Sequence, residues 1–235
     1  ENEIDVIVNC AAYTAVDKAE DNQELCAKLN SEAVGYLAKA AEENQAEFIQ
    51  ISTDYVFDGT NYVPYRETEP TCPNSVYGVT KLAGEKKALE YCSKAMIIRT
   101  AWLYSVFGNN FVKTMIRLGK ERESLGVIFD QIGTPTYARD LASAVFAAIR
   151  KGIIPGIYHF SNEGVCSWYD FTKSIHRIAG IGNCKVSPLH TDEYPAKAPR
   201  PHYSVLDKTK IKHTYGIEIP HWEESLEQCI KELNV

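Results

Sequence analysis

The residues best suited to chemistry are a tyrosine and a lysine four positions apart, Tyr77 and Lys81. The segment around them, residues 75–93, is rich in Leu, Ala, Glu and Lys, which predicts a helix that presents both side chains on one face. An ammonium beside a phenol stabilises the phenolate. We therefore expect Lys81 to lower the pKa of Tyr77 from about 10 toward neutral pH, which suits a proton donor.

A threonine and an aspartate lie upstream, where a buried strand is expected to end. Residues 48–51 form a short, mostly apolar run, which is typical of an interior parallel strand. Thr53 and Asp54 follow at the carboxyl end of this strand, and open α/β sheets bind their ligands at that edge. The sequence thus predicts that strand and helix bring polar side chains to one site.

The Tyr-x-x-x-Lys spacing alone is a weak signal, because Tyr169 and Lys173 repeat it. No strand tipped with Ser or Thr lies at a comparable distance before this second pair, so we interpret it as helix surface. The combination of strand end and helix pair is more specific. We therefore predict Thr53, Tyr77 and Lys81 as catalytic residues.

The composition argues against several classes of protein. The chain has 235 residues, a net charge of −6 and no clustered stripe of Lys and Arg, which makes a nucleic-acid partner improbable. It contains no apolar run long enough to cross a bilayer and opens with no signal peptide, so we expect no membrane partner. The seven cysteines are scattered without Cys-x-x-Cys, which predicts no metal site, no disulfide framework and a cytoplasmic location.

Strands and helices are expected to alternate along the chain. We predict strands over residues 4–9, 48–51, 95–100, 125–129 and 156–161, and helices over residues 16–44, 75–93, 108–118, 137–151, 167–179 and 222–233. Asp-Gly and three prolines predict a long loop over residues 56–74. This alternation predicts an α/β fold, a doubly wound parallel sheet with a small C-terminal lobe.

Three other positions could contact a ligand. The small residues after the first strand, at 10–14, permit close approach of a ligand or form a plain turn. Trp102 follows the third strand and could stack on a sugar or lie in the core. Arg200 could pair with a phosphate, although the pattern alone favours a surface salt bridge. Asn30 is interpreted as a hydrogen-bonding residue in helix packing.

Six stretches carry a family resemblance. They are Asn-Cys-Ala-Ala-Tyr-Thr-Ala-Val-Asp-Lys-Ala-Glu (9–20), Ser-Thr-Asp-Tyr-Val-Phe-Asp-Gly (52–59), Tyr-Gly-x-x-Lys (77–81), Arg-Thr-Ala-Trp (99–102), Gly-Thr-Pro-Thr (133–136) and Arg-Pro-His-Tyr-Ser (200–204). Together they resemble the extended short-chain dehydrogenase/reductase family and, within it, the dTDP-4-dehydrorhamnose reductases. The resemblance runs over the whole chain, and the first, second and fourth stretches are its most specific parts.

The resemblance implies a Rossmann-like fold and a reductase. NADPH or NADH would reduce the C4 ketone of dTDP-4-dehydro-L-rhamnose, a nucleotide sugar, to dTDP-L-rhamnose. Tyr77 would protonate the emerging alkoxide, Lys81 would also hold a nicotinamide ribose hydroxyl, and Thr53 would polarise the carbonyl. The remaining implied contacts are Asp54 and Trp102 to the sugar, Ala12, Tyr13, Thr14 and Tyr77 to the cofactor, and Arg200 to the nucleotide end of the substrate.

The resemblance also implies a domain division and a departure from the family. Residues 1–155 would form the NAD(P)-binding domain, with contributions from 156–180, and residues 156–235 mainly the substrate lobe, interleaved with it. No G-x-G-x-x-G turn is present. We therefore expect the family's first βαβ unit, on the order of 50 residues, to be missing, leaving an unprotected sheet edge and an incomplete diphosphate site.

Alternative functions remain open within the same branch. Sugar-nucleotide dehydratases carry Glu after the Asp as a base for elimination, whereas Tyr55 occupies that place here. A 4-epimerase or another nucleotide-sugar reductase would share Tyr77 and Lys81. A non-catalytic NADP-binding subunit, like the β subunit of methionine adenosyltransferase, keeps both motifs but lacks the tryptophan equivalent to Trp102. That residue favours the reductase, and a homodimer is left open.

Overall fold

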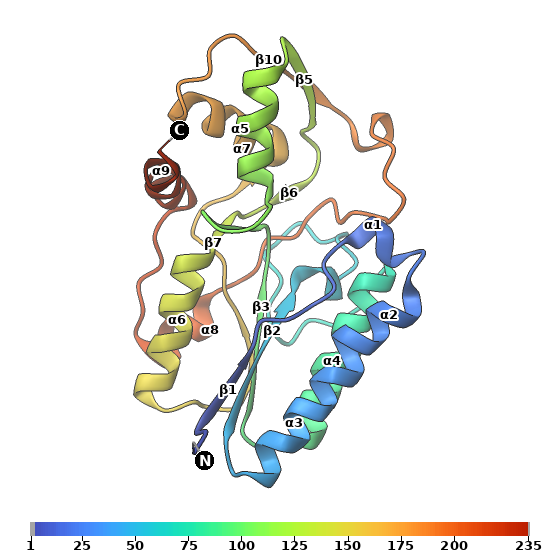
Figure 1. The fold of residues 1–235 in the computed structure, drawn as a ribbon, viewed down its shortest axis with the longest axis vertical. Helices are drawn as coiled ribbons and strands as arrows, with labels where there is room; N and C mark the ends of the chain where they lie inside the picture. The colour runs from blue at the N-terminus through green and yellow to red at the C-terminus, as the bar shows by residue number, and fades with distance from the viewer. Residues whose placement is uncertain (1–2, 235) are drawn as a thin grey trace.

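The computed structural model describes residues 3–234 and is built on a four-stranded parallel sheet. Its strands are β1 (Val6–Asn9), β2 (Glu47–Thr53), β3 (Ala95–Thr100) and β8 (Gly156–His159), paired in the order β1-β2-β3-β8. All run in the same direction, so their carboxyl ends meet at one edge (Figure 1). The predicted parallel sheet is confirmed.

Helices cover both faces of this sheet (Figure 1). One face carries α3 (Ala33–Glu43) and α4 (Val76–Tyr91), and the other carries α6 (Ala138–Lys151) and α8 (Thr209–Tyr215). Successive strand residues point to opposite faces. Accordingly, Phe48 packs with the first pair of helices, and its neighbour Ile49 packs with the second. This alternation produces the predicted doubly wound arrangement.

The first helical region is more divided than the sequence pattern predicted. A single helix was expected over residues 16–44, but the chain forms α1 (Val16–Ala19), α2 (Gln23–Ala27), a π-helical turn (Lys28–Glu32) and then α3. Glu20, Asp21 and Asn22 interrupt the first part. The π-helical turn inserts extra backbone into an otherwise continuous helix, a feature that often marks functional sites.

A second lobe sits beyond the carboxyl edge of the sheet. In it β5 (Ser124–Ile128) pairs in parallel with β10 (Lys185–Leu189), and the two strands pack with α5 (Phe111–Glu121), α7 (Trp168–Ile178) and α9 (Trp222–Leu233) around a separate core. Neither β10 nor α8 was predicted from the sequence. Proline in β10 and the short length of α8 weaken their periodic patterns.

Elements from both halves of the chain make up this lobe. The core that contains Val112 and Leu125 also contains Phe171 and Leu226, while β8 belongs to the central sheet. We therefore propose a division in which the lobes interleave more deeply than a boundary at residue 155 suggests. Short pairs join them: β4 (Leu103–Tyr104) with β7 (Thr136–Tyr137), and β6 (Ile132–Gly133) with β9 (Cys166–Ser167).

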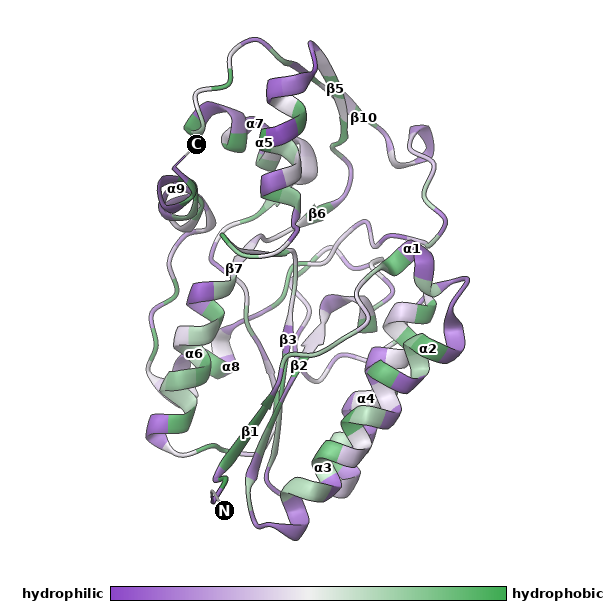
Figure 2. Ribbon diagram, viewed as in Figure 1, coloured by the Kyte–Doolittle hydropathy of each residue, from purple (hydrophilic) through white to green (hydrophobic). Residues whose placement is uncertain are grey.

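One edge of the sheet is apolar and unpaired. Within residues 3–234, β1 pairs with β2 alone, and Figure 2 shows β1 as one of the more hydrophobic segments. Ile4, which precedes β1, and Val8, which lies within it, are exposed. An apolar strand edge of this kind is a surface for further pairing. In the same residues, no helix is both long and apolar enough to cross a bilayer.

Candidate active site

The carboxyl end of β2 places Thr53 and Asp54 at the centre of the site. Thr53 ends the strand and caps the short 3-10 turn Asp54–Val56, because its Oγ1 accepts a hydrogen bond from the Tyr55 backbone N–H at 3.2 Å. The same hydroxyl donates to Asp54 Oδ1 at 2.9 Å. Both side chains are buried. The turn thus holds two polar groups where strand becomes loop.

Asp54 is poised to receive a ligand group. Its second oxygen, Oδ2, is buried and has no hydrogen-bond partner among the described residues. Burial raises the pKa of Asp54 to about 7, against the opposing effect of the Thr53 hydrogen bond. A buried acceptor without a partner costs about 1–3 kcal/mol, so a ligand hydroxyl that satisfied Oδ2 would bind favourably.

Helix α4 begins directly against this turn. Its N-cap is Ser75, whose Oγ accepts from the Gly78 N–H at 3.2 Å. A Cβ atom at Gly78 would lie 2.3 Å from the Tyr55 carbonyl oxygen, so only glycine allows the helix to approach so closely. As a result, the Tyr77 ring meets the Tyr55 ring edge to face, with centroids 5.4 Å apart.

Lys81 is buried one turn further along α4. Its Nζ donates to the Ile51 carbonyl oxygen of β2 at 2.7 Å, which fixes the ammonium beside the strand end. Burial lowers the pKa of Lys81 to about 8, while the negative charge of Glu85 opposes that shift. The strand and the helix therefore bring Thr53, Asp54, Tyr77 and Lys81 to one place.

The expected lowering of the Tyr77 pKa is not found. Burial raises the pKa of Tyr77, and the charge of Asp54 raises it further, against a hydrogen-bond effect of Thr53. Desolvation disfavours the phenolate more than the hydrogen bond of Thr53 stabilises it. Tyr77 is therefore a phenol that holds its proton at neutral pH, which is the protonation state a donor needs.

Asn30 holds the loop that follows β1. Its Oδ1 accepts from the Tyr13 N–H at 2.8 Å, and its Nδ2 donates to the Tyr13 carbonyl at 3.1 Å. The π-helical turn carries Asn30 into this position. Asn30 was interpreted as a helix-packing residue, whereas it also fixes the loop bearing Ala12, Tyr13 and Thr14. These three residues are half-buried or exposed at the carboxyl edge.

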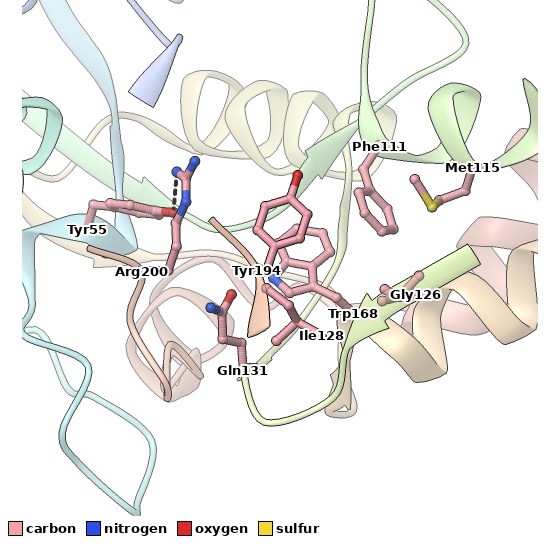
Figure 3. A pocket seen from close by; sticks show the side chains of 10 residues that line it. Tyr55, Phe111, Met115, Gly126, Ile128, Gln131, Trp168, Tyr194 and Arg200 are labelled. Atoms are coloured by element: carbon pink, nitrogen blue, oxygen red, sulfur yellow. Dashed lines mark hydrogen bonds between the residues drawn. The ribbon is translucent and has the colours of Figure 1, made fainter. Parts of the chain in front are cut away.

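A cavity of about 270 Å³ extends from this edge into the second lobe. Its wall is mostly aromatic or apolar and includes Tyr55, Phe111, Met115, Gln131, Trp168, Tyr194 and Arg200 (Figure 3). Tyr55 connects the cavity to Tyr77. Aromatic rings with a few polar groups are typical of small-molecule sites. The cavity is therefore a candidate binding site beside the predicted catalytic residues.

Arg200 lies at the mouth of this cavity with two partners. Its Nη2 donates to Asp17 Oδ2 at 2.6 Å, and its Nη1 donates to the Tyr55 hydroxyl at 3.2 Å (Figure 3). Asp17 also accepts from the Ala198 N–H at 3.0 Å. The salt bridge that the sequence pattern favoured is present, and Arg200 is also part of the cavity lining.

Trp102 lies behind the cavity wall. Its ring stacks on Trp168, with centroids 3.5 Å apart and planes at 10°, and Trp168 lines the cavity. The backbone of Trp102 has a φ of 48°, an uncommon conformation for a residue with a side chain. Its proposed contact with a sugar stays a prediction.

Several cavity residues were missed by the sequence analysis. Tyr55 was used only to argue against elimination, while Phe111, Gln131 and Trp168 were not considered as site residues. Among these residues, Tyr55 was the easiest to identify from the sequence, because it lies within the stretch 52–59. The others come from distant segments and converge through packing in the second lobe, where the Phe111 and Trp168 rings lie 4.6 Å apart.

Comparison with known proteins identifies the family. The RmlD substrate binding domain family matches residues 1–235. The dTDP-4-dehydrorhamnose reductase of Escherichia coli strain K12 is 45% identical over 97% of this chain and 80% of its own length. The chain belongs to the dTDP-4-dehydrorhamnose reductase family.

Solved structures agree with this family assignment. The dTDP-4-dehydrorhamnose reductase of Clostridium acetobutylicum superposes with a TM-score of 0.95 at 47% identity, covering 98% of this chain and 81% of the other. The reductase of Bacillus anthracis, solved in complex with NADP, has a TM-score of 0.94 at 42% identity, covering 97% and 80%. The Rossmann-like α/β fold expected from the sequence is thereby confirmed.

Proposed function

We propose that this protein reduces the C4 ketone of dTDP-4-dehydro-L-rhamnose to dTDP-L-rhamnose with a nicotinamide cofactor. The observation that carries the proposal is the convergence of Thr53, Tyr77 and Lys81 beside Tyr55, which lines the aromatic cavity. Membership of the reductase family supports it. NADPH is the favoured cofactor, because the Bacillus anthracis relative was solved with NADP.

The residues at the sheet edge fit a nicotinamide ribose. Lys81 Nζ donates to one protein acceptor, the Ile51 carbonyl, and an ammonium has two further hydrogens to offer. Asn30 holds the Tyr13 backbone of the adjacent loop in place. We propose that Lys81 binds ribose hydroxyls and that Ala12, Tyr13 and Thr14 line the cofactor. When bound, the reduced nicotinamide supplies hydride to the ketone carbon.

Tyr77 and Thr53 then act on the ketone oxygen. As hydride reaches C4, negative charge develops on that oxygen. Tyr77 holds its proton at neutral pH because burial raises its pKa, so it can donate the proton to the alkoxide. The Thr53 hydroxyl, fixed at the strand end, would turn its one hydrogen from Asp54 Oδ1 to the same oxygen and stabilise the charge.

The cavity would hold the remainder of the substrate. We propose that Asp54 accepts a hydrogen bond from a sugar hydroxyl through Oδ2, which lacks a protein partner. Arg200 would bind the diphosphate, since a guanidinium matches phosphate oxygens in a two-pronged arrangement. The aromatic wall, including Phe111 and Trp168, would bury the apolar parts of the nucleotide. Cytoplasmic location and the absence of a nucleic-acid partner stay predictions.

The function is tested by following NADPH absorbance. The protein expressed from its complete gene is mixed with NADPH and dTDP-4-dehydro-L-rhamnose, and the product is identified by NMR. We expect NADPH to be consumed and dTDP-L-rhamnose to form. Tight NADP binding without turnover would instead favour a regulatory subunit, and a sugar inverted at a carbon without NADPH consumption would favour an epimerase.

A further inference from the structure

Helix α4 carries a third ionisable residue on its catalytic face. Tyr77, Lys81 and Glu85 follow at intervals of four residues, so their side chains lie in successive turns of one face. Glu85 was not singled out by the sequence analysis. It lies away from the cavity and is fully buried, beneath Lys81 and against the sheet.

Glu85 is held by two strands. Arg99 of β3 donates to its carboxylate from Nε at 3.0 Å and from Nη2 at 2.7 Å, and Ser52 of β2 donates from Oγ. The side chains of Glu85 and Arg99 are each 2% exposed. Three donors on one buried carboxylate fix its position.

Stability alone is a poor explanation for this ion pair. Removing two charges from water is costly, and a well-packed apolar pair of similar volume is often as stable. One guanidinium nitrogen, Arg99 Nη1, is buried without a partner among the described residues, so the pair is not fully satisfied. A role in positioning the catalytic groups would explain why charge is placed there.

The group that Glu85 can influence is Lys81. The titratable residues that face Lys81 are Glu85 on the same helix, Cys10 after β1 and Cys26 on α2. Of these, Glu85 contributes the largest electrostatic effect, and that effect favours the charged ammonium. Its neighbour on β2, Ile51, offers only a carbonyl oxygen. Glu85 is therefore the main counter-charge to Lys81.

We infer that Glu85 is a positioning residue for the reduction, acting through Lys81. Locked by Arg99 and Ser52, its carboxylate keeps Lys81 charged and seated beside the strand end, so that the ammonium remains available to the cofactor ribose and to Tyr77. This inference rests on the proposed reductase function. It assigns Glu85 no contact with the substrate or the cofactor.

The test is the pH profile of kcat/KM for NADPH-dependent reduction by the protein expressed from its complete gene. The wild type should lose activity as pH rises through about 8, where Lys81 becomes neutral. In Glu85→Gln, we expect this alkaline limb to move to lower pH by about one unit, because the counter-charge is gone. At pH values below the limb, the rate should stay within about threefold of wild type.

A matched control and a second variant separate this effect from a folding defect. Glu90→Gln changes an exposed acid of the same helix and should leave the limb in place. The double variant Glu85→Gln/Arg99→Met leaves no unpaired buried charge, so it should fold and show the same displaced limb.

Two results would distinguish a failure of the proposed reductase function from a failure of the proposed role of Glu85. A wild type without reductase activity at any pH would overturn the proposed function itself. An active wild type whose limb coincides with that of the folded double variant would overturn the role of Glu85 alone, as would a loss of rate that is uniform across pH.

Discussion

The catalytic edge and the substrate cavity differ in how they are built. The edge takes its groups from two neighbouring elements, the end of β2 and the start of α4. Thr53, Asp54 and Lys81 are buried with protein partners, and Tyr77 is half-buried beside them. The cavity takes its wall from segments spread between Tyr55 and Arg200, mostly as aromatic surface. Under the proposed function, the chemistry would therefore depend on the sheet, and selection of the substrate on the second lobe.

The two regions differ in how deeply their ionisable side chains are buried. At the edge, burial keeps Tyr77 protonated and brings the pKa of Lys81 to about 8. At the cavity mouth, the ion pair of Arg200 with Asp17 is partly exposed, and such pairs contribute little to stability. Changes at the edge should therefore alter turnover and its pH dependence, while changes in the cavity should alter substrate affinity.

The largest effect should come from removing the phenol at the edge. Tyr77→Phe should lower kcat by about 10²–10⁴-fold, the usual contribution of a positioned acid, while leaving the fold intact. Tyr169→Phe is the matched control, since Tyr169 has the same spacing to a lysine on another helix. Steady-state NADPH oxidation compares them, and equal activity in both variants would remove Tyr77 from the mechanism.

The cavity mouth should respond through KM. Arg200→Met should raise KM for the nucleotide sugar by about 10–100-fold, because a charge-assisted hydrogen bond is worth roughly 1.5–3 kcal/mol. The value of kcat should change much less. Arg177→Met removes an exposed arginine paired with Glu223 and serves as the control. A drop in kcat at unchanged KM would place Arg200 with the chemistry and contradict the comparison.

Asp54 lies at the sheet edge and is proposed to bind the sugar. Its protonation should therefore add an acid limb to the pH profile of kcat/KM. Its raised pKa, about 7, means that the carboxylate is present above that pH and is neutralised as the pH falls through it. If the anion accepts a sugar hydroxyl, kcat/KM should decline several-fold below about pH 7. Asp54→Asn should lack this acid limb. An unchanged limb in the variant would show that another group titrates there.

The smallest effect on turnover is expected behind the cavity wall. A Cβ atom at Gly133 would lie 2.6 Å from both the Trp102 ring and Ser204 Oγ, so Gly133→Ala should cost about 1–3 kcal/mol of unfolding free energy. Gly182→Ala meets no atom within 4 Å and should be nearly neutral. Thermal unfolding of both proteins measures the difference. Equal stability of the Gly133→Ala and Gly182→Ala variants would show that the stacked Trp102 ring can move aside at little cost in free energy.

The same contrast explains what could be predicted from the sequence. The order of strands and helices around the main sheet follows from apolar runs and helical periodicity, and Thr53 with Tyr77 follows from their places on those elements. Phe111 and Gln131 carry no such local signal. They reach the cavity through packing of distant segments in the second lobe, where Phe111 contacts Trp168 and β5 pairs with β10.

The sequence also could not predict how burial shifts the pKa of a side chain. The tyrosine–lysine spacing predicted a lowered pKa for Tyr77, on the assumption that the nearby charge would dominate. In the folded protein desolvation dominates, and the pKa of Tyr77 rises. Asn30 shows the same limit, because only the π-helical turn reveals that its amide grips the Tyr13 backbone.

The central claim is that the residues at the sheet edge direct hydride to C4 of a nucleotide sugar. The most direct measurement uses NADPH deuterated at the transferred position, the protein expressed from its complete gene and dTDP-4-dehydro-L-rhamnose. NMR of the product should show deuterium at C4 of dTDP-L-rhamnose, and Tyr77→Phe should slow its appearance by about 10²–10⁴-fold. Deuterium retained in the cofactor, or found at another carbon, would contradict the account.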